Sequence, residues 1–332
     1  MAQDKKSVAV LGAGAVGSIL AASFKAAGES VILIESAPPR FEQVQRAGLQ
    51  VRVAGDGPIT TVKPDFLLRS IEELRGHEPE AIFICTKTWA LKQVLPALHQ
   101  VLSPHTLVIC FQNGIGLEEE AQQIFPAERV ARGIANYAGG VDENGQVTRV
   151  WFNPPNYLGP VATATTPRLE ALAAALSRAS LDTRSIPIHD IKKQVFLKSI
   201  LNSALSALCA TSNITMSQAL SYRPTRALAE RLVREGLAVA AAVGYTYGDN
   251  AFETCMKYLG EGGDHYPSMW TDLQRGSPTE IEVINGMIVE IGRMFENVSV
   301  EANRFLTAMV ITQEIKSGAR KPDDVPDYLK HF

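Results

Sequence analysis

The sequence predicts an α/β protein in which a doubly wound parallel sheet is followed by an all-α C-terminal domain. In the first part of the chain, short apolar runs that read as strands alternate with segments of helical composition, a pattern typical of parallel sheets. After residue 190 the strand patterns nearly disappear and helical patterns remain. A chain of 332 residues also exceeds the usual size of one hydrophobic core. We therefore expect two domains, residues 1–187 and 188–332.

The first strand, helix and second strand follow one another at the start of the chain. Residues 7–12, SVAVLG, form a valine-rich run that ends in glycine, and residues 14–28 have helical composition. Residues 31–35, VILIE, form another run of the buried-strand type. Two further strands are expected at residues 81–87 and 106–114, each followed by a helix-like segment. These repeated units predict the parallel sheet.

A change of pattern marks the end of the sheet domain. Residues 129–160 contain two extended segments around DENGQ, in which Asn144-Gly145 is a strong hairpin signal. We expect this hairpin to be an antiparallel addition that closes the domain. One more helix, TPRLEALAAALSRAS, and a last extended piece, TRSIPIHD, follow it. The later helices are expected at residues 191–210, 224–243, 278–294 and 299–317.

Composition excludes several classes of protein. Hydrophobic residues make up 46% and charged residues 20% of the chain, which is ordinary for a soluble globular protein. The net charge is −3 and no basic cluster past the N-terminus is denser than Lys192-Lys193, which argues against a nucleic-acid partner. Four cysteines without a CxxC pair indicate a reducing compartment, with no disulfide framework and no metal site. Because we find no secretory signal and no run of about 18 apolar residues, we expect a cytoplasmic protein with no membrane partner.

A glycine-rich loop joins the first strand to the first helix. Gly12, Gly14 and Gly17 stand in G-x-G-x-x-G register. The first glycine allows the tight turn, the second lets the backbone approach a pyrophosphate, and the third lets the helix pack close to the sheet. Ala15 and Val16 then open the helix whose N-terminus would hold the anion. This context predicts a Rossmann-type dinucleotide-binding domain, and the alternative is a glycine-rich turn used only for packing.

Residues after the second strand bear on the choice between NAD and NADP. Glu35, at the strand end, is the kind of residue that accepts a hydrogen bond from the ribose 2′-hydroxyl and so favours NAD. Arg40, just beyond the turn, favours NADP because it could accommodate a 2′-phosphate, and Ser36 could add a hydroxyl. These residues alone leave the two dinucleotides open.

One line of polar residues interrupts an otherwise apolar helix, KKQVFLKSILNSALSALCA, at residues 192–210. Lys198, Asn202 and Ser206 are four residues apart and therefore lie on one face. A ketone or imine that accepts hydride needs a proton donor, which a lysine ammonium can be, and an asparagine one turn on could bind the substrate. The structural alternative is that Lys198 extends to solvent from a core helix while Asn202 makes a structural hydrogen bond.

Five motifs together resemble the ketopantoate reductase family over nearly the whole chain. They are LGAGAVGS, CTKTW, CFQNGIG, FLKSILNSALSAL and HYPSMWTDLQRGSPTEIEVINGMI. The resemblance implies an N-terminal domain that binds NADPH and a helical C-terminal domain. It also implies reduction of 2-dehydropantoate (ketopantoate) to pantoate, in pantothenate and coenzyme A biosynthesis.

The resemblance also assigns roles to residues of these motifs. Lys198 would be the general acid, and Glu280 would be the carboxylate that acts with it. Lys87 and Asn113 each end a predicted strand, where ligands of open α/β sheets bind, and would line the cofactor and substrate cleft. The candidate substrate-binding residues are Asn113, Asn202, Ser206 and Ser268. The candidate cofactor-binding residues are Gly12, Gly14, Ala15, Val16, Gly17, Ser36, Arg40, Lys87 and Asn113.

Several of these residues have structural alternatives. Ser277-Pro278-Thr279-Glu280 matches a capping box with proline at the first helical position, so the carboxylate of Glu280 could bond back to the helix start. Ser268 precedes a predicted helix and could be its N-cap. Lys87 could be a solvated lysine, and Asn113 could belong to an Asn-Gly turn.

Two departures from the family pattern affect the expected function. Ser206 occupies a place where family members often carry a second asparagine, which makes the identity of the substrate less secure. Glu35-Ser36 replaces the family's arginine directly after the second strand, so we expect NADPH with NADH still open. The alternatives are another 2-keto acid reductase, a β-hydroxyacid or opine-type dehydrogenase, and a nucleotide-binding sensor without turnover. The expected partner is a small-molecule 2-keto acid, and a homodimer is one assembly that the sequence allows.

Overall fold

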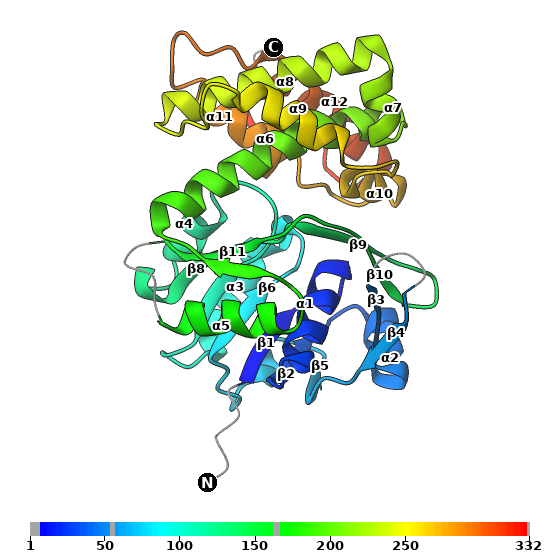
Figure 1. Cartoon of the computed structure of the whole chain (residues 1–332), viewed down its shortest axis with the longest axis vertical. Helices are drawn as coiled ribbons and strands as arrows, with labels where there is room; N and C mark the ends of the chain where they lie inside the picture. The colour runs from blue at the N-terminus through cyan, green and yellow to red at the C-terminus, as the bar shows by residue number, and fades with distance from the viewer. Residues whose placement is uncertain (1–6, 54–56, 162–166, 331–332) are drawn as a thin grey trace. The chain divides into compact units, whose positions relative to one another are not determined.

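The computed structural model describes residues 7–53, 57–161 and 167–330, and the chain divides into two compact units (Figure 1). The first, called the sheet unit, runs to Gln112 and resumes over Leu117–Lys192. The second, called the helical unit, contains Asn113–Gly116 and all residues from Lys193 onward. The loop Asn113–Gly116 therefore belongs to the helical unit, although the chain on both sides of it belongs to the sheet unit. The polar leader, residues 1–6, lies outside the described residues.

Eight strands of the described chain form one sheet, in the order β12-β11-β8-β7-β6-β1-β2-β5. Neighbouring strands run parallel, except that β11 is antiparallel to β8. Because β2 and β6 flank β1, the direction of strand addition reverses at β1, which is where doubly wound sheets bind ligands. The predicted fold class is confirmed. The strands are β1 (Ser7–Leu11), β2 (Ser30–Ile34), β5 (Phe66–Leu68), β6 (Ala81–Ile84), β7 (Leu107–Cys110), β8 (Val130–Ile134), β11 (Asn156–Pro160) and β12 (Thr183–Ser185).

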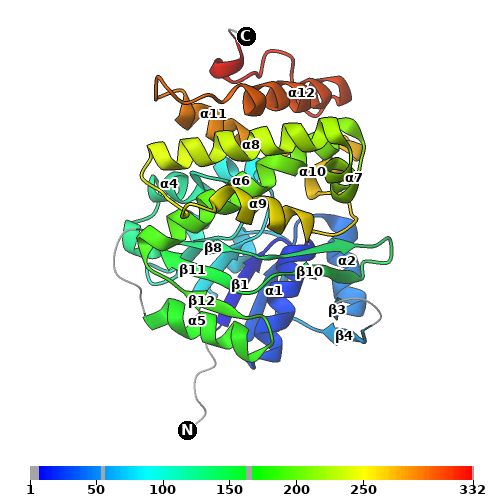
Figure 2. The same cartoon turned by 45° about the horizontal axis from the view of Figure 1, so that its top comes forward.

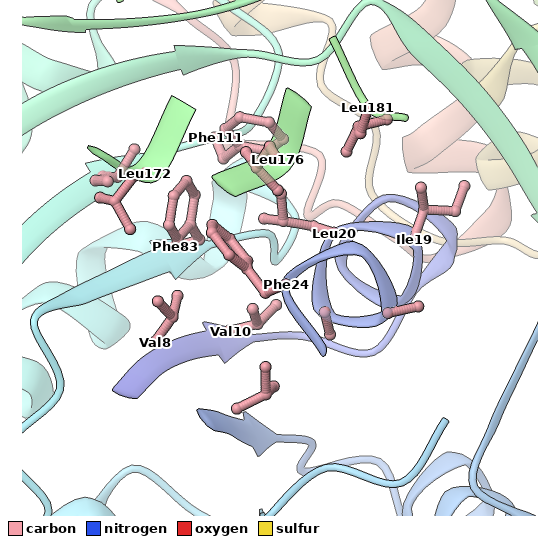
Figure 3. Packing of buried hydrophobic residues seen from close by; sticks show 14 of the residues in the cluster. Val8, Val10, Ile19, Leu20, Phe24, Phe83, Phe111, Leu172, Leu176 and Leu181 are labelled. Carbon is pink, nitrogen blue, oxygen red and sulfur yellow. The ribbon is translucent and has the colours of Figure 1, made fainter. Parts of the chain in front are cut away.

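Helices cover the sheet because its strands are apolar on both faces. On one face, Phe83 packs between Phe24 of α1 (Ala15–Ala26) and Phe111, with ring centres 5.2 and 5.6 Å away. Leu172 and Leu176 of α5 (Pro167–Arg178) reach the same cluster (Figure 3). The alternate strand residues, which point to the opposite face, are also fully buried. The other helices of this unit are α2 (Pro38–Ala47), α3 (Leu91–Val101), α4 (Leu117–Gln122) and the short η1 (Glu72–Leu74), η2 (Thr88–Ala90) and η3 (Ala127–Arg129).

A second sheet packs beside α1. The predicted hairpin forms at Gly145, whose N–H donates to the carbonyl of Asp142, and its two antiparallel strands belong to this second sheet. Its second strand also pairs with a segment that the sequence patterns did not identify as a strand, in the order β4-β3-β10-β9. Tyr137 donates a 3.0 Å hydrogen bond to the carbonyl of Val16, so this sheet braces the first turn of α1. The strands are β3 (Leu49–Val53), β4 (Ile59–Val62), β9 (Tyr137–Val141) and β10 (Val147–Phe152).

The helical unit is built around α6 (Ile188–Ser212), the long helix near the middle of that unit in Figure 2. By length and composition alone α6 could cross a membrane, although its apolar residues are interrupted by polar ones and 61% of its most apolar window is buried. Its apolar residues, such as Ile200 and Leu208, lie in the core of the unit. The other helices are α7 (Met216–Ser221), α8 (Arg223–Ala242), α9 (Ala251–Gly260), α10 (Ser268–Gln274), the π-helix η4 (Glu282–Gly286), α11 (Met287–Gly292), α12 (Glu301–Ser317) and η5 (Asp327–Leu329).

Candidate functional site

The glycine loop has the backbone that its sequence predicts. Gly12 has a φ of +101°, which favours glycine, and a Cβ atom there would lie 3.2 Å from the backbone of Cys85. At Gly17 a Cβ atom would overlap with the carbonyl oxygen of Gly12. Both positions therefore require glycine so that α1 can pack against the ends of β1 and β6.

Gly14 differs from the other two glycines because a Cβ atom there would meet no atom within 4 Å. It is the N-cap of α1, where the first backbone N–H groups lack partners inside the helix. The open space therefore lies at the positive end of a helix dipole, which stabilises a negatively charged group. The loop, continued by Ala15 and Val16, fits a pyrophosphate.

Glu35 follows β2 and is bonded to the glycine loop. Its Oε2 atom accepts a 2.8 Å hydrogen bond from the N–H of Ala13, and its Oε1 atom accepts one of 2.8 Å from the N–H of Ala37. The carboxylate is therefore fixed at the end of β2, beside the loop. Ser36, the next residue, is exposed.

Arg40, in the first turn of α2, bonds to three separate segments of the sheet unit. Its Nε donates to the carbonyl of Ala13 at 2.8 Å, and its Nη2 donates to the hydroxyl of Ser18 at 3.0 Å. Its Nη1 donates to the carbonyl of Gly145 in the hairpin at 2.6 Å. Burial lowers the pKa of Arg40, while the charges of Glu35 and Asp142 oppose that shift. The guanidinium thus joins the glycine loop, α1 and the second sheet.

Polar side chains also gather at the ends of β6 and β7. Lys87 is half-buried and lies directly before η2. The hydroxyl of Thr86 and both amide atoms of Gln112 are buried and lack a hydrogen-bond partner within the described residues. Buried polar groups are nearly always paired in folded proteins. We therefore infer that a polar ligand group fits at this edge, next to the glycine loop.

A buried ion pair holds the end of β7. The guanidinium of Arg132 lies 3.3 Å from the carboxylate of Glu118, and both side chains are at most 3% exposed. Arg132 also donates to the carbonyls of Cys110 and Gln112, at 2.7 and 2.8 Å. Burial raises the pKa of Glu118, and the charge of Arg132 opposes that rise. The backbone that leads into Asn113 is therefore fixed from the sheet side.

The polar line predicted on α6 lies inside one continuous helix. Lys198 and Asn202 are half-buried, and Ser206 is 9% exposed. At their four-residue spacing the three side chains share a face of α6.

The Glu280 side chain is 7% exposed and belongs to the same helical unit. Its Oε2 atom lies 3.5 Å from Nδ2 of Asn113, at the outer limit of a hydrogen bond. Two residues that the family resemblance marked, 167 positions apart in the chain, are thus brought together.

The loop that carries Asn113 docks on the π-helix η4. The N–H of Ile115 donates to the carbonyl of Val283 at 2.9 Å. Gly114 has a φ of +111°, and a Cβ atom there would overlap with the side chain of Val283. A glycine after Asn113 is therefore required for this close approach.

The capping box at Ser277, which was the structural alternative for Glu280, does not form because no helix begins there. Residues 277–279 are irregular and the first helical residue is Glu282, so Glu280 cannot be the third residue of that helix. The N–H of Thr279 donates instead to Oε1 of Glu314 at 2.6 Å, and the N–H of Ile281 donates to the hydroxyl of Thr279. The backbone around Glu280 is therefore held by α12.

Glu314 is fully buried and is bonded through both oxygen atoms. Its Oε1 atom accepts from Thr279, and its Oε2 atom accepts from Nε of Arg320 at 2.7 Å. Arg320 also bonds to Glu282, on the other side of Glu280. Burial lowers the pKa of Arg320, but its hydrogen bonds to the two carboxylates outweigh that effect and raise the pKa.

The π-helix in turn packs on α6. The side chain of Asn285 donates to the carbonyl of Ser203 at 3.0 Å and to Asn303 at 3.1 Å. Ser203 directly follows Asn202, so the segment after Glu280 is anchored on the helix that carries the polar line.

Ser268, the remaining candidate for substrate binding, is exposed as the first residue of α10. The N-cap of that helix is Pro267, so Ser268 is not the N-cap.

The sequence alone did not identify the buried charged residues that fix the backbone next to Asn113 and Glu280. Arg132, inside the apolar run VARGIA, was the one visible signal, because a charge there needs a buried partner. Glu118 lies in a run of three glutamates that reads as a solvated face, and Glu314 lies in a polar stretch of its helix. Their partners are distant in sequence, so no local pattern marks them.

Two family models together match most of the chain. The model described as ketopantoate reductase PanE/ApbA matches residues 8–162, and the corresponding C-terminal model matches residues 190–314. The chain belongs to the ketopantoate reductase family. The predicted family is confirmed, and with it the oxidoreductase class.

Relatives of known name agree with this assignment. The 2-dehydropantoate 2-reductase of Pyrococcus horikoshii is 26% identical over 313 residues, which cover 94% of this chain and 99% of the relative. The structure of the PanE/ApbA family ketopantoate reductase of Ralstonia eutropha JMP134 has a TM-score of 0.82 at 25% identity and covers 94% and 99% of the two chains. A complex of D-mandelate dehydrogenase with NADH has a TM-score of 0.80 at 25% identity, with coverage of 93% and 99%.

The geometry of the glycine loop predicts different effects for two alanine substitutions, one mainly on stability and the other mainly on dinucleotide binding. Gly17→Ala should lower the free energy of unfolding by about 1–3 kcal/mol, because the new methyl group overlaps with backbone. Gly14→Ala should cost less stability than Gly17→Ala, about 0.5–1 kcal/mol, because alanine is a poorer N-cap than glycine but meets no neighbouring atom. It should weaken dinucleotide binding by about tenfold or more, since the methyl group fills the open space. Urea unfolding and calorimetric titration measure the two effects, and unchanged binding by Gly14→Ala would contradict the assigned fit.

Substitution of Glu314 tests how the backbone around Glu280 is held. Glu314→Gln should lower the free energy of unfolding by about 3 kcal/mol, because it leaves Arg320 without one of its buried partners. The matched control is Glu301→Gln on the same helix, whose side chain is 67% exposed. It should change stability by less than about 0.5 kcal/mol. Equal unfolding midpoints for the two variants would show that Glu314 does not hold this segment.

Proposed function

We propose that this chain reduces 2-dehydropantoate (ketopantoate) to pantoate, a step of pantothenate and coenzyme A biosynthesis. The observation that carries the proposal is the contact between Asn113 and the buried Glu280 carboxylate in the helical unit. The names of the curated relatives support the same reaction. We further propose, from the sequence alone, that the enzyme is cytoplasmic and acts without nucleic-acid or membrane partners.

The proposed roles follow from the chemistry of the reduction. A bound nicotinamide dinucleotide supplies the hydride. The electron pair of the carbonyl bond moves to the oxygen atom, which then needs a proton. Lys198 donates that proton from its ammonium group, and the Glu280 carboxylate stabilises the charged form of the lysine.

Amides and hydroxyls of the same unit are proposed to bind the rest of the substrate. Asn202 lies one turn after Lys198 on the same face of α6, and Ser206 lies one turn further. Asn113 supplies a second amide, next to Glu280. Ser268, which is exposed at the start of α10, is also proposed to contact the substrate.

A second candidate function is reduction of another 2-keto acid. Ser206 stands where family members often carry an asparagine, and its side chain is shorter than that of asparagine. A structural relative at 25% identity is a D-mandelate dehydrogenase. The corresponding reaction here would reduce a bulkier 2-keto acid, such as phenylglyoxylate, to its 2-hydroxy acid.

Replacement of the proposed proton donor gives a direct test. Lys198→Met should lower kcat by about 10²–10⁴-fold, the usual contribution of a general acid, and should leave dinucleotide binding unchanged. The assay measures turnover by the wild type and by Lys198→Met of ketopantoate, phenylglyoxylate and a 3-hydroxy acid, each with both dinucleotides. The preferred substrate decides between the two candidate functions.

The matched control is Lys193→Met, five residues earlier on α6 and on a different face. Its ammonium lies 5.3 Å from the centre of the Tyr247 ring, and its removal should leave kcat near the wild-type value. Full turnover by Lys198→Met would remove the donor assignment. Failure of the wild type to reduce any 2-keto acid would favour a nucleotide-binding sensor.

A further inference from the structure

We propose that this enzyme binds NAD(H) in preference to NADP(H), because the Glu35 carboxylate is fixed at the end of β2 and the guanidinium of Arg40 is engaged in three other hydrogen bonds. The inference rests on the proposed use of a nicotinamide dinucleotide and departs from the NADPH that the family resemblance implies. It follows from the hydrogen bonds of Glu35 and Arg40, which in the sequence alone favour different dinucleotides.

The Glu35 carboxylate is fixed in place. Its two oxygen atoms accept hydrogen bonds from the N–H groups of Ala13 and Ala37, on opposite sides of the strand end. A carboxylate at the end of the second strand accepts a hydrogen bond from a ribose 2′-hydroxyl. A 2′-phosphate carries about −1.5 to −2 charges and offers only acceptors, so a carboxylate repels it.

Arg40 is the cation that could have offset the repulsion between the Glu35 carboxylate and a 2′-phosphate. Its guanidinium donates to the carbonyls of Ala13 and Gly145 and to the buried hydroxyl of Ser18. To reach a phosphate, the side chain would have to break three hydrogen bonds that join the glycine loop, α1 and the hairpin. Arg40 therefore positions the loop for either dinucleotide and does not select NADP.

One other cation lies nearby. Arg69 follows β5, which pairs with β2 at Ile34, and its side chain is exposed. Its guanidinium carbon lies over the Phe41 ring of α2, 4.0 Å from the ring centre. An exposed cation is screened by solvent and salt, so we expect Arg69 not to outweigh the fixed charge of Glu35.

Calorimetric titration with the oxidised dinucleotides tests the inference without turnover. For the wild type, the Kd for NAD⁺ should be at least about tenfold lower than that for NADP⁺, the effect of one like charge at close range. Glu35→Gln removes the charge and one of the two N–H hydrogen bonds, since its NH₂ group cannot accept, and it should reduce that ratio by about tenfold. Because these titrations contain no 2-keto acid, they stand even if the proposed reaction fails.

Two arginine variants distinguish positioning from selection. Arg40→Met should weaken NAD⁺ and NADP⁺ binding by the same factor and lower the unfolding midpoint, because it releases the glycine loop. Arg69→Met should leave the ratio of the two dissociation constants unchanged. The inference is overturned if wild-type enzyme binds NADP⁺ as tightly as NAD⁺, or if either variant weakens NADP⁺ binding alone.

Discussion

A carboxylate that is almost removed from water has to be held by hydrogen-bond donors or by positive charge, and Glu280 at 7% exposure is such a group. The local structure of the helical unit is arranged around it. The helix that local sequence places at residue 278 begins only at Glu282, as a π-helix, and the loop with Asn113 docks against that π-helix. π-Helical turns are frequent at functional sites, where they redirect side chains. Here the delayed start leaves the Glu280 side chain facing Asn113.

Each residue of this contact is supported by a buried ion pair. Arg132, paired with Glu118, bonds to the carbonyl of Gln112 directly before Asn113. Glu314, paired with Arg320, bonds to the N–H directly before Glu280. Buried ion pairs contribute little net stability compared with well-packed apolar residues, but breaking one is strongly destabilising. Their use beside these residues is to fix backbone, and the proposed proton transfer would require such fixed geometry to keep its groups aligned.

The sequence predicts the parts of this enzyme that local patterns encode. The glycine loop and the polar line on α6 could be read because spacing alone defines them. Strands β3 and β4 of the second sheet were missed, because β3 pairs with β10, almost a hundred residues away, and no local pattern shows that pairing. The capping box at Ser277 does not form, because the Ser277 N–H that it would use donates to the carbonyl of Asp272. The next segment is held by Glu314, 35 residues from Thr279, which no local pattern shows. The choice of dinucleotide stayed open because the partners of Arg40 lie in three separate segments.

The central claim is that Lys198 and Glu280 act as one proton-transfer unit, and a double-mutant cycle on kcat/KM tests it most directly. Lys198→Met, Glu280→Gln and the double variant are compared with wild type, with dinucleotide saturating. If the two groups act as a unit, each single change lowers kcat/KM by about 10³-fold and the double variant loses little more than the larger single effect. If the two effects multiply in the double variant, the groups act independently and this account of the mechanism is contradicted.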